Sequence, residues 1–102
     1  MKPADTDQNP LTDEELCRLA ASGDRVAEEA LVVRYRWLVR ACARPYFLAG
    51  GDSEDLIQEG MVGLLNAIRE FSSEKGSPFR AYAETCIRHR ILSAIRAAAR
   101  DK

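Results

Sequence analysis

One side of a helix predicted near the C-terminus, over about residues 79–102, combines basic, hydroxyl and aromatic side chains. At about 100° per residue, these side chains fall within one arc of the helix. The arc contains Tyr82, Thr85, His89, Leu92, Ser93, Arg96 and Arg100, and Arg88 lies just beyond it. Arginines can bind phosphates or guanine edges, and an aromatic ring can stack on an unpaired base. The pattern allows nucleic-acid binding, although a basic helix face on its own is more often simply solvated.

A second candidate surface lies on the helix predicted over about residues 52–71. Its apolar face is formed by Ile57, Met61, Leu64, Ile68 and Phe71. The opposite face mixes acids, amides and exposed aliphatic side chains, namely Asp55, Gln58, Glu59, Val62, Leu65, Asn66 and Arg69. Gly60 and Gly63 each cost roughly 1 kcal/mol relative to alanine inside a helix, so we expect another backbone to approach them closely. A charged rim around an aliphatic centre suits a protein interface, and a solvated side of a core helix is the alternative.

The sequence offers little for catalysis or metal binding. We find no nucleophile–base pair and no phosphate-binding glycine loop, so we predict no enzyme, no catalytic residue and no cofactor. Cys86 and His89 could begin a metal site, but no second pair of ligands is spaced to complete one for zinc. The cysteines are odd in number and widely spaced, which argues against a disulfide framework.

The composition predicts one soluble domain with an uneven charge distribution. A chain of 102 residues with 46% hydrophobic and 30% charged residues can bury a modest core. Its apolar runs are too short to cross a bilayer and no signal peptide is apparent, so we expect a cytoplasmic protein with no membrane partner. The net charge is −1, yet residues 1–24 carry six acids against two bases and residues 74–102 carry seven bases against three acids. This asymmetry favours an anionic partner near the C-terminal end.

Helices are expected over most of the chain. Residues 1–11 contain two prolines and should be a disordered or irregular lead-in, with the folded domain covering residues 12–102. A capping box at Thr12 and Glu15 predicts a short helix to about Ala21, with its leucines facing inward. The next helix should run from about Arg25 to Arg44, where Pro45 ends or kinks it. We expect its apolar stripe to be Val26, Ala30, Val33, Trp37, Leu38 and Ala41 or Cys42, with Arg34, Arg36, Arg40 and Arg44 solvated.

The last helix should start at Ser77 and Pro78, which form a cap followed by a proline in the first turn. Its core face is predicted to contain Phe79, Ala83, Cys86, Ile87, Ile91, Ala94 and Ala98. No segment alternates as a strand would. The fold class is therefore all-α, a compact bundle of three main helices plus a short N-terminal helix.

The motifs DLIQEGMVGL, NAIREF and KGSPFRAYAETCIRHRI follow one another and together resemble region 2 of bacterial sigma factors of the sigma-70 family. The resemblance runs from about Thr12 to the last residue. With the preceding stretch YRWLVRACARPYF, it is greatest for the stationary-phase and sporulation sigma-H group. The resemblance implies transcription initiation, in which this domain docks on core RNA polymerase and recognises and melts the promoter −10 element.

Core docking is implied for the helix over residues 52–71. In the family, the D-L-I-Q-E-G helix docks on a coiled coil of the beta-prime subunit. We carry that role to Asp55, Gln58, Glu59, Met61 and Leu65, of which the first three match the motif most strictly.

DNA binding is implied for the last helix. Family members flip an adenine of the non-template strand out of the stack and hold it in a pocket. The matching aromatic residue is Tyr82, with Phe71, Glu74 or Ser72 and Lys75 along the pocket wall, and a half-buried core ring is the alternative for Tyr82. His89 and Leu92 fall where the upstream end of the −10 element is read. The implied DNA-binding residues are Lys75, Tyr82, Thr85, Arg88, His89, Leu92, Arg96 and Arg100.

The sequence departs from the housekeeping sigma factors in ways that bear on function. Thr85 and Cys86 stand where that group has adjacent tryptophans, which implies weaker melting and stricter dependence on promoter sequence. The further helical domains of such sigma factors do not follow, so we expect either an excised domain or a natural truncation. A decoy or co-sigma fragment that occupies polymerase without reading DNA is the alternative function, and an anti-sigma factor is a further candidate partner.

Overall fold

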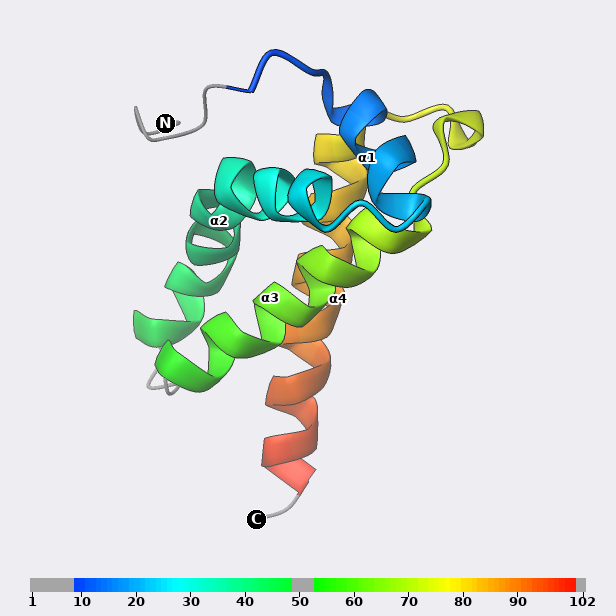
Figure 1. Cartoon of the computed structure of the whole chain (residues 1–102). Coiled ribbons are helices and arrows are strands. Elements are labelled where there is room, and N and C mark those ends of the chain that lie inside the picture. The colour runs from blue at the N-terminus through cyan, green and yellow to red at the C-terminus, as the bar shows by residue number, and fades with distance from the viewer. Residues whose placement is uncertain (1–8, 49–52, 101–102) are drawn as a thin grey trace.

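The computed structural model describes residues 9–48 and 53–100, except for the side chains of Leu48, Ser53, Lys75 and Arg100. Four α-helices and one short 3-10 helix form the described chain, and no residue of those two ranges is in a strand. The helices are α1 (Asp13–Ala21), α2 (Arg25–Leu48), α3 (Ser53–Glu70) and α4 (Phe79–Arg100), with η1 (Ser73–Lys75) before α4. The all-α prediction is confirmed, and Figure 1 shows α1 packed across the end of the bundle from which α4 runs toward the C-terminus.

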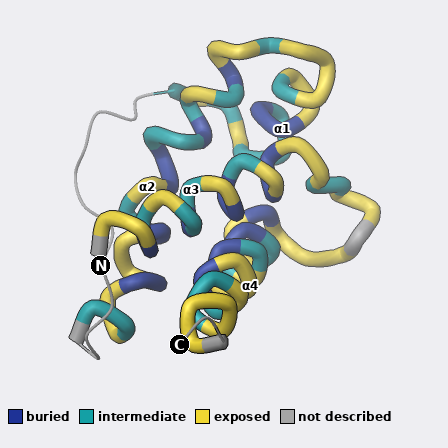
Figure 2. The backbone as a smooth tube through the Cα atoms, turned by 90° about the horizontal axis from the view of Figure 1, so that it is seen from below, coloured by how far each residue is buried: buried dark blue, intermediate teal, exposed yellow. Residues whose placement is uncertain are grey.

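The helices pack around one apolar core to which all four contribute. Its largest fully buried side chains are Leu16, Leu31, Val39, Leu64, Ile68, Phe79, Ile87 and Ile91. Figure 2 shows the corresponding pattern along the backbone, with buried stretches turned inward and exposed stretches on the outside of each helix. Burial of such side chains contributes about 1.5–3 kcal/mol each.

The short helix α1 begins at the predicted capping box. The Thr12 hydroxyl accepts a hydrogen bond from the Glu15 N–H (3.1 Å), and the Glu15 carboxylate accepts one from the Thr12 N–H (2.8 Å). The bond from the Thr12 backbone lowers the pKa of the Glu15 carboxyl, because it favours the charged form. The prediction that Leu19 faces inward was wrong. Leu19 is 39% exposed, because α1 turns only the side with Leu16 and Cys17 toward the core.

The predicted apolar stripe of α2 was correct at Leu38 and Cys42 and displaced by about one residue at its N-terminal end. Val26 is 73% exposed, while the buried apolar residues are Ala27, Leu31, Tyr35, Leu38, Val39, Cys42 and Ala43. The displacement has a packing reason, since α2 contacts α1, α3 and α4, and three neighbours bury a wider face than one apolar stripe suggests. The helix continues through Pro45 to Leu48, so the proline does not end it near Arg44.

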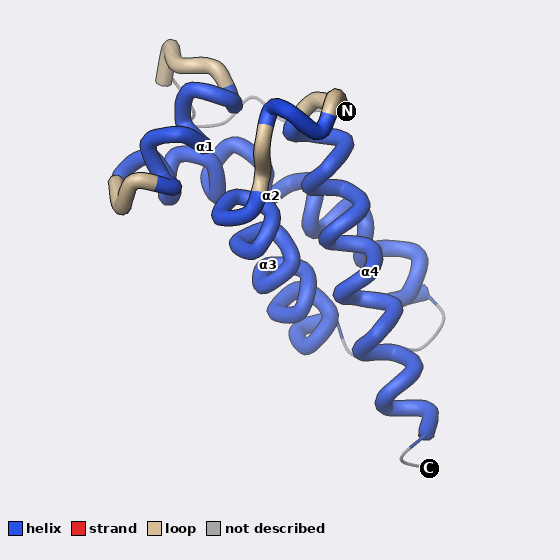
Figure 3. The backbone as a smooth tube through the Cα atoms, turned by 90° about the vertical axis from the view of Figure 1, so that its right-hand side faces the viewer, coloured by secondary structure: helices blue, strands red, loops and turns tan. Residues whose placement is uncertain are grey.

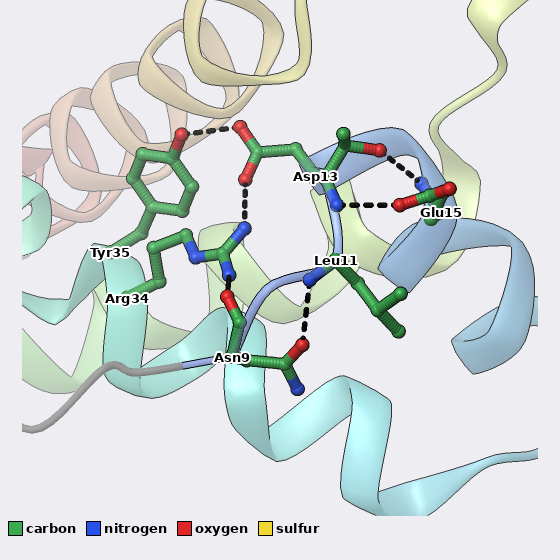
Figure 4. A network of polar contacts seen from close by, with 7 residues as sticks. Asn9, Leu11, Asp13, Glu15, Arg34 and Tyr35 are labelled. Atoms are coloured by element: carbon green, nitrogen blue, oxygen red, sulfur yellow. Dashed lines mark hydrogen bonds and ion pairs between the residues drawn. The ribbon is translucent and has the colours of Figure 1, made fainter.

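A polar network joins the chain before α1 to α2 (Figure 4). The Arg34 guanidinium donates to the Asp13 carboxylate (2.9 Å) and to the Asn9 carbonyl (3.0 Å), and the Tyr35 hydroxyl donates to the same carboxylate. Arg34 is therefore buried and not solvated as predicted, because a paired and hydrogen-bonded charge can be buried. Burial, and then the bond to Asp13, raise the pKa of Tyr35. Residues 9–11 are irregular and held in place here, whereas the rest of the predicted lead-in, residues 1–8, lies outside the described residues.

Helices α3 and α4 lie side by side (Figure 3), and glycines of α3 allow the neighbouring helices to come close. A Cβ atom added to Gly63 would lie 2.9 Å from the Cys86 carbonyl oxygen and 3.0 Å from the Ile87 Cα. A Cβ atom added to Gly60 would lie 2.7 Å from Cγ1 of Val39 in α2. The close approach predicted from the two glycines is confirmed at Gly63, where it fixes α4 directly against α3.

Candidate functional site

The exposed face of α3 has the composition predicted for an interface. Val62 is 38% exposed and Leu65 is half-buried, so these two residues form an aliphatic centre. The exposed polar residues around them are Asp55, Gln58, Asn66 and Arg69. Met61 is half-buried and packs against the core, so it is less accessible than the exposed docking residues Asp55 and Gln58.

Glu59, another predicted docking residue, has a partner within the chain. Its Oε1 lies 2.8 Å from Nε of Arg90, and the two side chains are 37% and 47% exposed. The sequence did not predict Arg90 as a site residue, because it lies outside the side of α4 that was predicted to bind nucleic acid. The ion pair joins the edge of the α3 face to α4.

A groove separates the beginning of α3 from the end of α4. It has a volume of about 360 Å³ and is lined by Asp55, Leu56, Gln58, Glu59, Ala94, Ile95 and Ala98. The small side chains of Ala94 and Ala98 leave this space open. Ala98 was predicted to face the core but is exposed, because no other described helix covers the end of α4 here. Three predicted docking residues thus border one concave surface rather than a flat face.

Tyr82 ends a row of aromatic rings. Its ring centroid lies 5.7 Å from that of Phe71, which contacts Phe79 at 5.4 Å, and Phe79 contacts Tyr35 at 5.5 Å. Tyr82 is half-buried while Phe79 is fully buried, so the row runs from the core to the surface. The row holds the Tyr82 ring in one place and leaves part of it accessible, a geometry compatible both with a core ring and with one wall of a base pocket.

The turn after α3 carries the other predicted wall residues. The Ser72 hydroxyl accepts a hydrogen bond from the Glu74 N–H (3.3 Å), which caps η1, and Gly76 ends it with φ 81°. Glu74 is exposed and Ser72 half-buried. The backbone of Lys75 belongs to η1, while its side chain lies outside the described residues.

The outer face of α4 follows the predicted arc. Thr85, His89 and Arg96 are exposed and Leu92 is half-buried, whereas the side chain of Arg100 lies outside the described residues. The Thr85 hydroxyl donates back to the Ala81 carbonyl (3.2 Å).

Arg88, at the edge of the same arc, carries a charge that has a counterion. Its Nη2 lies 2.7 Å from Oε2 of Glu84, and this hydrogen bond is the main cause that raises the pKa of Arg88. Arg88 therefore keeps its positive charge, but Glu84 partly offsets it toward an incoming phosphate.

The described residues contain neither a cluster of metal ligands nor a helix that could span a membrane. Within residues 9–48 and 53–100, no group of three or more His, Cys, Asp or Glu side chains could hold a metal ion. None of the described helices is both long enough and apolar enough to cross a bilayer.

Comparison with known proteins decides the family. The family described as Sigma-70 region 2 matches residues 31–101, which include all of α3 and α4 and most of α2. The chain belongs to this sigma-70 region 2 family. The two candidate surfaces of this region 2 domain, on α3 and α4, lie within the matched residues. Helix α1 precedes them.

Curated sigma factors resemble this region 2 domain over most of its length. It is 47% identical over 92 residues to the RNA polymerase sigma-H factor of Bacillus licheniformis, covering 90% of this chain and 41% of that protein. The same identity and length relate it to the sigma-H factor of Bacillus subtilis (strain 168), of which it covers 42%. It is 40% identical over 91 residues to the principal sigma factor HrdD of Streptomyces griseus, covering 89% of this chain and 27% of that protein. The region 2 domain thus spans about two fifths of the sigma-H factors it matches.

Proposed function

We propose that this region 2 domain acts in transcription initiation, docking on core RNA polymerase through α3 and recognising and melting the promoter −10 element through α4. The observation that carries the proposal is the exposed face of α3, which has an aliphatic centre and a polar rim. The buried side of α3 packs closely against α4 at Gly63. Interfaces commonly combine an apolar centre with a polar rim. A protein with these partners acts where the bacterial chromosome is, in the cytoplasm.

The docking surface consists of Asp55, Gln58, Glu59 and Leu65, with Met61 at its edge, and its partner is the beta-prime coiled coil. The groove beside Gln58 suits a convex helical partner, because a coiled coil can seat side chains in it.

The DNA surface extends from Tyr82 to Arg96. Tyr82 stacks on or walls off an unpaired base of the non-template strand, supported from behind by Phe71. His89 and Leu92 read the upstream end of the element, and Arg96 contacts the backbone. Thr85, Arg88, Arg100 and Lys75 complete the set proposed from the sequence.

A decoy that docks on polymerase without reading DNA is the second candidate. It is favoured by one feature of α4, namely that the Thr85 hydroxyl and the Arg88 guanidinium already have partners within the helix. The two candidates share the α3 surface and differ only in what α4 binds.

Binding to core polymerase tests the part that both candidates share. We expect Asp55→Ala and Gln58→Ala to weaken binding to purified core polymerase by about tenfold, the scale of losing a central interface contact. Glu29→Ala, which removes an exposed acid from α2, is the matched control for Asp55→Ala and should bind normally. Unchanged binding of both α3 variants would reject the docking surface.

A further inference from the structure

A row of arginines lies along the outer face of α2. Arg36, Arg40 and Arg44 recur every four residues, which places them on one side of the helix, and all three are exposed. Residues 30–48 contain no aspartate or glutamate. Within the described part of the chain, none of the three side chains has a hydrogen-bond or ion-pair partner.

The stability of α2 does not explain this row. Basic residues stabilise a helix when they lie in its last turn, near the negative end of the helix dipole. The last turn of α2 has no basic residue, and the arginines lie earlier. No carboxylate lies one turn away from Arg40 or Arg44, so there is no ion pair along the helix either.

Two arginines of α4 lie near α2. The Arg80 guanidinium lies over the Trp37 ring, 5.3 Å from its centroid. Arg88 neighbours Cys42, which is buried on the core side of α2 and does not belong to the row of exposed arginines. Positive charge of α4 therefore reaches the row on α2 through Arg80, which lies over Trp37.

We propose that Arg36, Arg40 and Arg44 bind the sugar–phosphate backbone of promoter DNA and extend the DNA surface of α4 onto α2. This inference rests on the proposed function of α4. A phosphate backbone is a continuous row of negative charge, which a regular row of long side chains can follow. All three residues are arginines, whose planar guanidinium groups bind phosphates through paired hydrogen bonds.

The test measures DNA affinity of the full chain over a range of salt concentrations. The probe is a fluorescent duplex that continues into a single strand carrying a −10 sequence, beside a scrambled version. The double variant Arg36→Gln/Arg40→Gln is compared with Arg18→Gln/Arg25→Gln, which removes two exposed arginines elsewhere and loses the same charge.

We expect the α2 double variant to bind both probes about tenfold more weakly at moderate salt. The slope of log affinity against log salt should fall by roughly 1.4–1.8, since each lost phosphate contact removes about 0.7–0.9. The ratio of affinities for the −10 and scrambled probes should not change, because phosphate contacts carry no sequence information. The control double variant should stay within about twofold of the parent chain.

An α2 double variant with the parent's affinity and salt slope would overturn the inference. If the parent chain still preferred the −10 probe in that case, the proposed function of α4 would stand without the α2 extension. A variant that lost affinity for core polymerase and not for DNA would assign the row to an acidic protein surface and reject phosphate binding. If the parent chain showed no −10 preference, the function of α4 would fail, and the salt slope would still decide whether α2 binds phosphates.

Discussion

The Arg90 guanidinium lies 2.8 Å from the Glu59 carboxylate, so an ion pair joins the helix proposed to bind DNA to the helix proposed to bind polymerase. The pair lies beside the close contact between Gly63 and the Cys86–Ile87 backbone. The two proposed surfaces therefore belong to one rigid unit, in which the position of α3 sets the position of α4.

The Glu59–Arg90 pair should contribute little to stability. We expect Arg90→Gln to lower the free energy of unfolding by less than about 1 kcal/mol, because both side chains are partly exposed and solvent screens the pair. A double-mutant cycle with Glu59→Gln, followed by urea unfolding at low and high salt, measures the coupling. A coupling that is zero at low salt would show that the two side chains do not interact in solution.

Alanine at position 63 should destabilise the domain. Gly→Ala inside a helix normally adds about 1 kcal/mol of stability, but here the new Cβ would meet backbone atoms of α4 that cannot rotate away. We expect Gly63→Ala to lower the free energy of unfolding by about 1–3 kcal/mol, as overpacking does. Asn66→Ala, one turn further along the exposed side of α3, is the control and should be neutral or stabilising. A Gly63→Ala variant as stable as the parent would refute the close approach.

Stability should fall at alkaline pH partly through Cys17. Burial in the core raises the pKa of its thiol from 9.0 to about 12. The unfolded chain therefore loses this proton before the folded chain does, so the contribution is complete below about pH 9 and is lost as pH rises toward 12. At pH 10.5 the parent should have lost about 1–2 kcal/mol more, relative to pH 8, than Cys17→Ala has. Urea unfolding at both pH values measures the difference, and parallel losses in the two proteins would contradict a raised pKa.

The ring of Tyr82 should matter for DNA more than for folding. We expect Tyr82→Ala to weaken binding to a single-stranded −10 oligonucleotide by about 1–3 kcal/mol, the range for a lost base–aromatic stack. Tyr82→Phe keeps the ring and the contact with Phe71, and should retain most of the affinity. If Tyr82→Ala lowered the melting temperature but left DNA affinity unchanged, the ring would be a core residue and not part of a base pocket.

The helices could be predicted from the sequence because their signals are local. The capping box joins Thr12 to Glu15 only three residues away, and Gly63 within α3 indicated that another backbone comes close. The prediction of which side of α3 is exposed was also correct, because a helix with one apolar and one polar side can pack on the core in only one orientation.

The errors come from contacts between residues far apart in the sequence. Arg34 is buried because Asp13, in α1, supplies its counterion, and nothing near Arg34 in the sequence indicates that pairing. The same holds for Arg90 and Glu59, which lie on different helices. The buried side of α2 differs in part from the predicted stripe because three other helices determine which of its residues are buried. Small residues such as Ala27 and Ala43 do not indicate from the sequence whether they are buried or exposed.

The central claim is that the α4 surface reads the −10 element, and binding of single-stranded oligonucleotides tests it most directly. The chain would be titrated against a fluorescent −10 oligonucleotide and a scrambled one of the same composition, at low and moderate salt. We predict a preference for the −10 sequence that persists at moderate salt, because contacts to bases are less sensitive to salt than contacts to phosphates. Equal binding to both oligonucleotides that disappears as salt rises would contradict base reading by the isolated chain, and the decoy would then be the better account.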